Sequence, residues 1–126
     1  MKKEPVDRDI LWRLPKTDLH VHLDGSMRVE TLIDIAKKKG VTLPSMDVDG
    51  LRKFVEMDEN CESLEEYLRA FDITCSVLQD FESLRRAAFE LAEDAAAENV
   101  KYMEVRFCPL LHTNEGLSLE KIVKAV

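Results

Sequence analysis

Two histidines separated by one residue are the part of this sequence whose types and spacing could do chemistry. His20 and His22 lie in residues 17–25, TDLHVHLDG, where apolar and polar residues alternate strictly. Residues i and i+2 of a strand share one face, about 6 to 7 Å apart at a rise of about 3.3 Å per residue. Two imidazoles at that spacing can lean onto one divalent ion, with Zn–N bonds of about 2.0–2.1 Å. Asp24 directly follows and could contact a substrate hydroxyl or support the ligands.

An H-x-H pair in a strand is by itself only a weak indication of a metal site. Two further features favour it here. The histidines share their face with Asp18 and not with Leu19, Val21 and Leu23, so they do not fill an apolar core. A tight Asp-Gly turn follows at once, at the carboxyl end of the strand, where parallel α/β folds place their sites.

The elements that must position these side chains follow from hydrophobic periodicity and from capping residues. Ser26 is expected to cap a helix that Gly40 closes, and Ser63 with Glu66 forms a capping box. Asn99 can take the left-handed turn that closes the longest helix. The expected elements are strands at 17–23 and 100–108 and helices at about 27–39, 49–55, 64–78, 81–98 and from 119 onward.

Alternating strands and helices predict an α/β fold with a parallel sheet. Two strands do not make a stable sheet of that kind, because parallel strands are normally covered on both faces. The last helix also presents an apolar face with no partner in the sequence: Leu119, Ile122, Val123 and Val126. The chain is therefore expected to be the front of a larger domain, with exposed apolar surface on the strand edges and on this stripe that promotes self-association.

Composition excludes several classes of protein. The chain has 126 residues, 45% of them hydrophobic, and a formal charge of −7, so it is neither disordered nor suited to nucleic acid or anionic membrane surfaces. It has no run of about 20 apolar residues and no apolar leader segment, which predicts a cytoplasmic protein. Cys61, Cys75 and Cys108 form no C-x-x-C pair, so we expect buried free thiols in a reducing compartment.

Several segments resemble the adenosine deaminase family of the metal-dependent amidohydrolases. Residues 14–26, LPKTDLHVHLDGS, resemble its first barrel strand, residues 63–71 its helical lid, and residues 102–109, YMEVRFCP, its second strand. The resemblance extends from about Leu14 to Leu111. It implies the N-terminal part of a (β/α)8 TIM barrel, an incomplete barrel with two barrel strands and a helical lid excursion, made by residues 14–126 after a leader at 1–13.

The resemblance also implies roles for individual residues. His20 and His22 would be the first two zinc ligands, with His22 also against the nucleoside. Asp24 would bind the ribose 5′-hydroxyl, which favours a nucleoside over a free base because adenine-specific relatives tend to carry Glu there. The apolar wall and gate of the pocket would be formed by Leu64, Tyr67, Leu68, Phe71 and Leu111. The spacing of the helical residues in this set is also the spacing of any helix that faces an apolar core, so the pattern alone does not distinguish a pocket wall from a core face. Arg106 and Glu104 fit a structural polar pair better than catalytic groups.

The implied reaction is the hydrolytic deamination of adenosine to inosine and ammonia, with a zinc ion that activates water. The family's third metal His, metal Asp, catalytic Glu and water-orienting His come from later strands, and no residue here matches them. His112 is expected to be a surface loop residue. The chain alone is therefore expected to be inactive. Two alternatives remain open: an adenine or other purine or amidohydrolase-type deaminase, and a non-catalytic metal-binding or assembly module.

Overall fold

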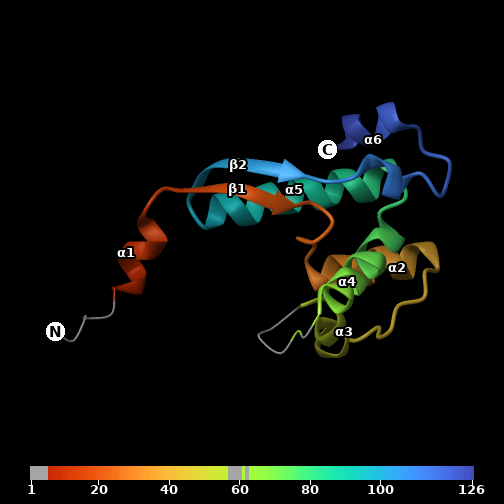
Figure 1. The fold of residues 1–126 in the computed structure, drawn as a ribbon, viewed down its shortest axis with the longest axis horizontal. Helices are drawn as coiled ribbons and strands as arrows, with labels where there is room; N and C mark the ends of the chain where they lie inside the picture. The colour runs from red at the N-terminus through yellow and green to blue at the C-terminus, as the bar shows by residue number, and fades with distance from the viewer. Residues whose placement is uncertain (1–5, 57–60, 62) are drawn as a thin grey trace.

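The computed structural model describes residues 6–56, 61 and 63–126, with the side chain of Glu66 left out (Figure 1). The chain folds into α-helices, one short 3-10 helix, η1, and a pair of strands that the helices cover only in part. The elements in chain order are α1 (Arg8–Arg13), β1 (Lys16–His22), α2 (Val29–Lys39), α3 (Val48–Val55), α4 (Leu64–Val77), α5 (Phe81–Ala97), β2 (Val100–Arg106), η1 (Pro109–His112) and α6 (Leu119–Ala125).

The strands β1 and β2 pair in parallel, which confirms the predicted fold class and strand direction. Lys16 lies opposite Val100, and His22 lies opposite Arg106. Figure 1 shows both arrowheads pointing toward α2 and α4, with α5 running along the strands and α1 at the far end. The chain therefore brings the carboxyl ends of its strands to one edge, where α4 lies close by. This edge is where the sequence places its two histidines.

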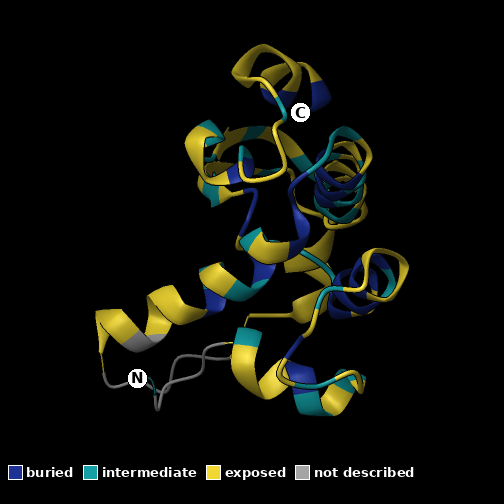
Figure 2. Cartoon of the chain, turned by 90° about the vertical axis from the view of Figure 1, so that its right-hand side faces the viewer, coloured by how far each residue is buried: buried dark blue, intermediate teal, exposed yellow. Residues whose placement is uncertain are grey.

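The apolar core lies between the helices and beneath one side of the sheet (Figure 2). Its fully buried members include Leu32 on α2, Leu51 on α3, Leu84 on α5 and Ile122 on α6, each at most 1% exposed. The strands contribute less to it, because most residues of β1 and β2 are exposed. None of the described helices is long and apolar enough to span a membrane.

The start of α2 differs from the prediction. The helix begins at Val29, and its N-cap is Arg28, not Ser26. The Ser26 hydroxyl donates to the carbonyl of His22 at 2.6 Å, and this hydrogen bond stabilises the turn after β1. Arg28 reaches across to α5, where its Nε donates to Asp94 at 3.0 Å. The predicted closure of α2 by Gly40, at φ 70°, is confirmed.

The sequence suggested that the C-terminal apolar stripe has no partner, and this is only partly correct. Ile122 is fully buried in the core, because α6 packs against α5. Leu119, Val123 and Val126 stay exposed. The second strand ends at Arg106, two residues earlier than expected, and Asn99 takes the predicted left-handed turn at φ 62°. The capping box at Ser63 and Glu66 involves a side chain outside the described residues.

Candidate active site

The two histidines converge at the carboxyl end of β1. Their Nε2 atoms lie 3.2 Å apart, and their ring centroids lie 5.2 Å apart. Two ligands of one tetrahedral ion, each about 2.0–2.1 Å from it, are separated by roughly 3.3 Å. The pair therefore fits a shared divalent ion. His20 and His22 are two residues apart on one face of β1, and their side chains lean toward each other.

Asp24 lies in the turn after β1 and is almost completely buried, at 3% exposure. Its Oδ1 is 3.9 Å from Nδ1 of His22. That oxygen has no hydrogen-bond partner among the described residues. A buried carboxylate oxygen without a donor is a free acceptor, so the position suits a ligand that brings a hydroxyl, an amine or a positive charge.

A cavity of about 490 Å³ opens beside His22 and Asp24. One wall is aromatic: Phe71 meets the His22 ring edge-on at 5.7 Å, and Tyr67 lies 5.5 Å from Phe71. The lining residues are His22, Asp24, Tyr67, Leu68, Phe71, Arg106, Phe107, Cys108 and Leu111. The fold thus brings together the pocket residues named from the sequence, except Leu64, which is 71% exposed and does not line the cavity.

Sequence reasoning did not assign three of the lining residues to the pocket: Arg106, Phe107 and Cys108. They lie at the end of β2, and strand pairing could have found them. Two parallel strands end at the same edge of a sheet, so the end of β2 must lie beside the histidines. Arg106 also donates to the carbonyl of Leu19 at 3.1 Å and lies 3.8 Å from Glu104, which confirms the structural polar pair.

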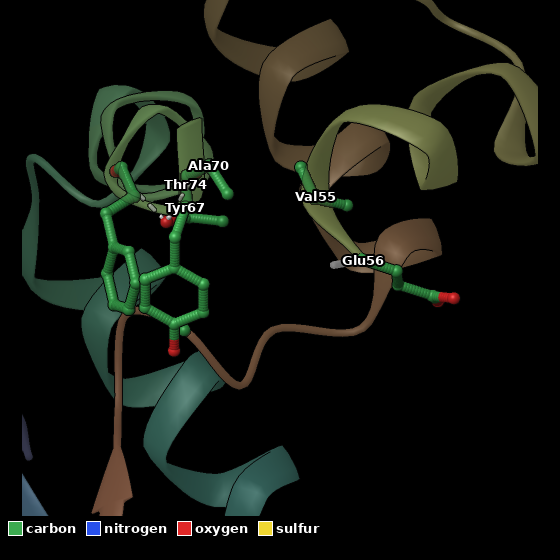
Figure 3. A pocket seen from close by; sticks show the side chains of 7 residues that line it. Val55, Glu56, Tyr67, Ala70 and Thr74 are labelled. Atoms are coloured by element: carbon green, nitrogen blue, oxygen red, sulfur yellow. Dashed lines mark hydrogen bonds between the residues drawn. The ribbon is translucent and has the colours of Figure 1, made fainter. Parts of the chain in front are cut away.

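A second cavity, of about 440 Å³, lies on the other side of the aromatic wall (Figure 3). Val55 lines it from the α3 side, and Ala70 and Thr74 line it from α4, while Glu56 contributes to the lining with its carboxylate directed away. It shares Tyr67 and Phe71 with the first cavity. The shared lining makes α4 a partition, whose aromatic side chains separate the two spaces. Gly25 also lines the second cavity.

His112 is not a surface residue, which corrects the expectation from the sequence. It is fully buried, and its Nδ1 lies 2.9 Å from the carbonyl oxygen of Leu78. Gln79 holds the loop inward, because its side chain donates to the carbonyl of Leu111 and accepts from the backbone N–H of Asn114. Burial lowers the pKa of His112 and favours the neutral ring. No local sequence pattern signals these long-range contacts.

The expectation of buried thiols is also wrong in part. Cys108 is exposed, and Cys61 and Cys75 are partly buried. Burial, assisted by the nearby carboxylate of Asp24, raises the pKa of Cys75 to about 12, so this thiol is protonated at neutral pH. Cys108 lies between the end of β2 and Pro109, the first residue of η1, and lines the cavity.

Two parallel strands connected through helices belong to the α/β class of folds, which includes the (β/α)8 barrels. The family model described as "Adenosine deaminase" matches residues 15–126. The chain belongs to the adenosine deaminase family.

Individual relatives give the same result. An adenosine deaminase of Clostridium botulinum (strain 657 / Type Ba4) is 54% identical over 114 residues, which are 90% of this chain and 34% of that protein. A probable adenosine deaminase of Dictyostelium discoideum is 49% identical over 121 residues, which are 96% of this chain and 16% of that protein. The chain thus spans about a third, or less, of the length of these relatives.

Solved structures agree on the fold. The adenine deaminase of Arthrobacter aurescens superimposes with a TM-score of 0.76 at 29% identity, covering 89% of this chain and 33% of that one. The N6-mAMP deaminase of Arabidopsis gives a TM-score of 0.73 at 32% identity, covering 93% and 34%. The two parallel strands and their helices therefore correspond to about a third of a TIM-barrel enzyme, an incomplete barrel.

Proposed function

We propose that this chain supplies the first two strands, the first pair of metal ligands and part of the pocket of a zinc-dependent adenosine deaminase. Such an enzyme hydrolyses adenosine to inosine and ammonia. The main support is the convergence of the His20 and His22 Nε2 atoms, 3.2 Å apart, beside a cavity that also contains Asp24. The 54% identity to a protein named adenosine deaminase supports the same substrate.

In this proposal each element of the site has one task. His20 and His22 hold the ion, which when bound supplies Lewis-acid activation of water. Phe71 and Tyr67 form the apolar wall against which the purine lies, and they exclude bulk water from it. The carboxylate of Asp24, which lines the cavity beside His22, accepts a hydrogen bond from the ribose 5′-hydroxyl.

We further propose that the isolated chain does not turn over adenosine. A catalytic zinc site uses three protein ligands and a water molecule. The sequence contains only three histidines, and the third, His112, is buried against Leu78. Zinc-dependent production of inosine by the purified monomeric chain, measured by chromatography, would contradict this part of the proposal.

The substrate is tested in a chimera in which residues 15–126 replace the matching segment of the Clostridium botulinum protein. We expect zinc-dependent turnover of adenosine, with much slower turnover of adenine and of N6-methyl-AMP. His20→Ala should abolish zinc-dependent turnover, whereas Lys37→Ala, a change at an exposed position of α2, should not alter it. A chimera that prefers adenine would favour the alternative suggested by the Arthrobacter aurescens structure.

A second variant tests the role of Asp24. Asp24→Asn should raise the KM for adenosine, because the amide cannot accept from the ribose hydroxyl as strongly as a carboxylate does. It should leave the residual turnover of adenine unchanged, since adenine has no ribose. Equal effects on both substrates would show that Asp24 acts on the ion or on the fold and not on the sugar.

A further inference from the structure

A second group of potential metal ligands lies behind the cavity. Asp24, Cys75 and His112 come from the turn after β1, from α4 and from η1, and their ligand atoms all lie within 4.8 Å of one another. The Cys75 Sγ is 3.9 Å from Oδ2 of Asp24. Asp24 and His112 are 3% and 0% exposed. Three elements far apart in the sequence thus bring an oxygen, a sulfur and a nitrogen together in the interior.

Two of these ligand atoms, Oδ1 of Asp24 and Nε2 of His112, are buried without a hydrogen-bond partner among the described residues. The hydrogen bond of Nδ1, the other ring nitrogen of His112, decides whether Nε2 is a donor or an acceptor. Nδ1 of His112 lies 2.9 Å from the Leu78 carbonyl oxygen, which only accepts, so Nδ1 carries the proton. In the neutral ring Nε2 is then an acceptor, and so is the carboxylate oxygen. The thiol of Cys75 donates to the other oxygen of Asp24, Oδ2, so it leaves Oδ1 and Nε2 unpaired. Unpaired buried acceptors are costly unless a cation or a further donor lies beside them.

We propose that Asp24, Cys75 and His112 form a second metal site, which takes a divalent ion of the zinc type and is separate from the His20–His22 pair. The mixed oxygen, sulfur and nitrogen donors match the ligands that zinc accepts. Hydrogen bonding of Nδ1 to a backbone carbonyl is the outer contact that metal-bound histidines usually make, and Leu78 provides it without any ion present.

Binding requires the thiolate form of Cys75. The S–H bond breaks, its electron pair remains on sulfur and forms the bond to the ion, and the proton leaves to solvent. No oxidant or reductant takes part. The sulfur also distinguishes an ion from the alternative occupant, a water molecule whose two O–H groups point at the two acceptors, because water would leave Cys75 as a thiol.

The site shares Asp24 with the proposed nucleoside pocket, yet it does not depend on that function. A carboxylate has two oxygens and about four acceptor positions, so one can serve the ion while another faces the cavity. An ion at this position would fix the orientation of Asp24 next to His22. The test therefore measures metal binding and not deamination, and the two proposals can fail independently.

The test is a cobalt titration of the whole chain carrying His20→Ala, His22→Ala, Cys61→Ser and Cys108→Ser. This variant keeps Cys75 as its only thiol and removes the first histidine pair. We expect one equivalent of Co²⁺ to bind and to produce a thiolate-to-cobalt charge-transfer band in the near ultraviolet. Adding Cys75→Ser should abolish the band. Zinc should displace the cobalt and bleach it.

Absence of the band in the four-fold variant, with circular dichroism unchanged from the native chain, would overturn the proposal in favour of a water-filled gap. If that variant does not fold, X-ray absorption of the Cys61→Ser, Cys108→Ser chain decides, because this chain keeps both His20 and His22 and has Cys75 as its only thiol. After loading with two equivalents of zinc, one sulfur for every two zinc ions supports the site, and only nitrogen and oxygen neighbours refute it.

Discussion

Replacing Gly25 with alanine is expected to destabilise the chain through one identifiable contact. A Cβ added there would lie 3.0 Å from both Cε1 and Cζ of Phe71 and 3.5 Å from Cβ of His22. Carbon atoms pack at about 3.5–4.0 Å, so the ring must shift by several tenths of an ångström. A shift of the Phe71 ring disturbs two contacts, because the ring packs edge-on against His22 and lies 5.5 Å from the ring of Tyr67.

Two effects of opposite sign set the change in the free energy of unfolding. Overpacking costs about 1–3 kcal/mol in a well-packed site. Replacing glycine by alanine stabilises by about 0.4–1 kcal/mol where the backbone allows it, because the unfolded chain loses conformational freedom. Gly25 is not among the glycines with positive φ, so the backbone allows it. The overpacking is larger, and the expected net loss is about 1 kcal/mol.

Urea unfolding followed by circular dichroism measures this loss, and Phe71→Ala tests its cause. With the ring removed, Gly25→Ala should become stabilising by about 0.4–1 kcal/mol, so the sign of its effect reverses. Gly40→Ala is the matched control: with φ at 70° and no described atom within 4 Å, its cost is conformational and should be the same in both backgrounds. A Gly25→Ala loss that is unchanged without Phe71 would refute the reasoning.

Three further predictions concern the core, an ion pair and the exposed surface. Leu51→Ala, at a fully buried position, should cost about 2–5 kcal/mol, while Leu64→Ala, 71% exposed, should change stability by less than about 0.5 kcal/mol; similar losses in urea titrations would contradict this. The hydrogen-bonded guanidinium of Arg28 holds the pKa of Asp94 below its ordinary value of 3.8. The pair therefore stabilises the fold above that pH, and the contribution is lost as pH falls through the lowered pKa. Arg28→Gln should flatten the decline of the urea midpoint in acid, and an unchanged pH profile would count against the pair. Exposed apolar side chains on the strands, such as Leu19 at 58%, should cause concentration-dependent association in sedimentation experiments, and a monomer at every concentration would disprove it.

Local sequence patterns predicted most of the elements, because the forces that form them act over a few residues. Strict alternation predicted β1, and apolar spacing with Gly40 predicted α2 and its end. Ser26 shows the limit of such patterns. Serine is a good N-cap, but the Ser26 hydroxyl donates to the His22 carbonyl in the turn after β1, and the helix starts at Val29, two residues after the predicted start. Local propensity does not reveal which backbone group a serine hydroxyl will bond.

The paired strands explain why the pocket was only partly predictable. The residues of α4 were named from the family resemblance, and their periodic spacing alone could not separate a pocket wall from a core face. Phe107 and Cys108 enter the cavity only because β2 pairs in parallel with β1, so that both strands end at one edge. Sequence periodicity assigns residues to faces, whereas the neighbours of each face depend on strand pairing.

The sequence by itself determined the chemistry at the end of β1. His20 and His22 lie two residues apart in a strand, and backbone geometry alone places both rings on one face. Only the tertiary structure decided what lies behind Asp24. His112 became buried, and Cys75 came next to the same carboxylate, because helix packing and the hydrogen bonds of Gln79 bring distant segments together. Those contacts depend on the whole core, and no local pattern encodes them.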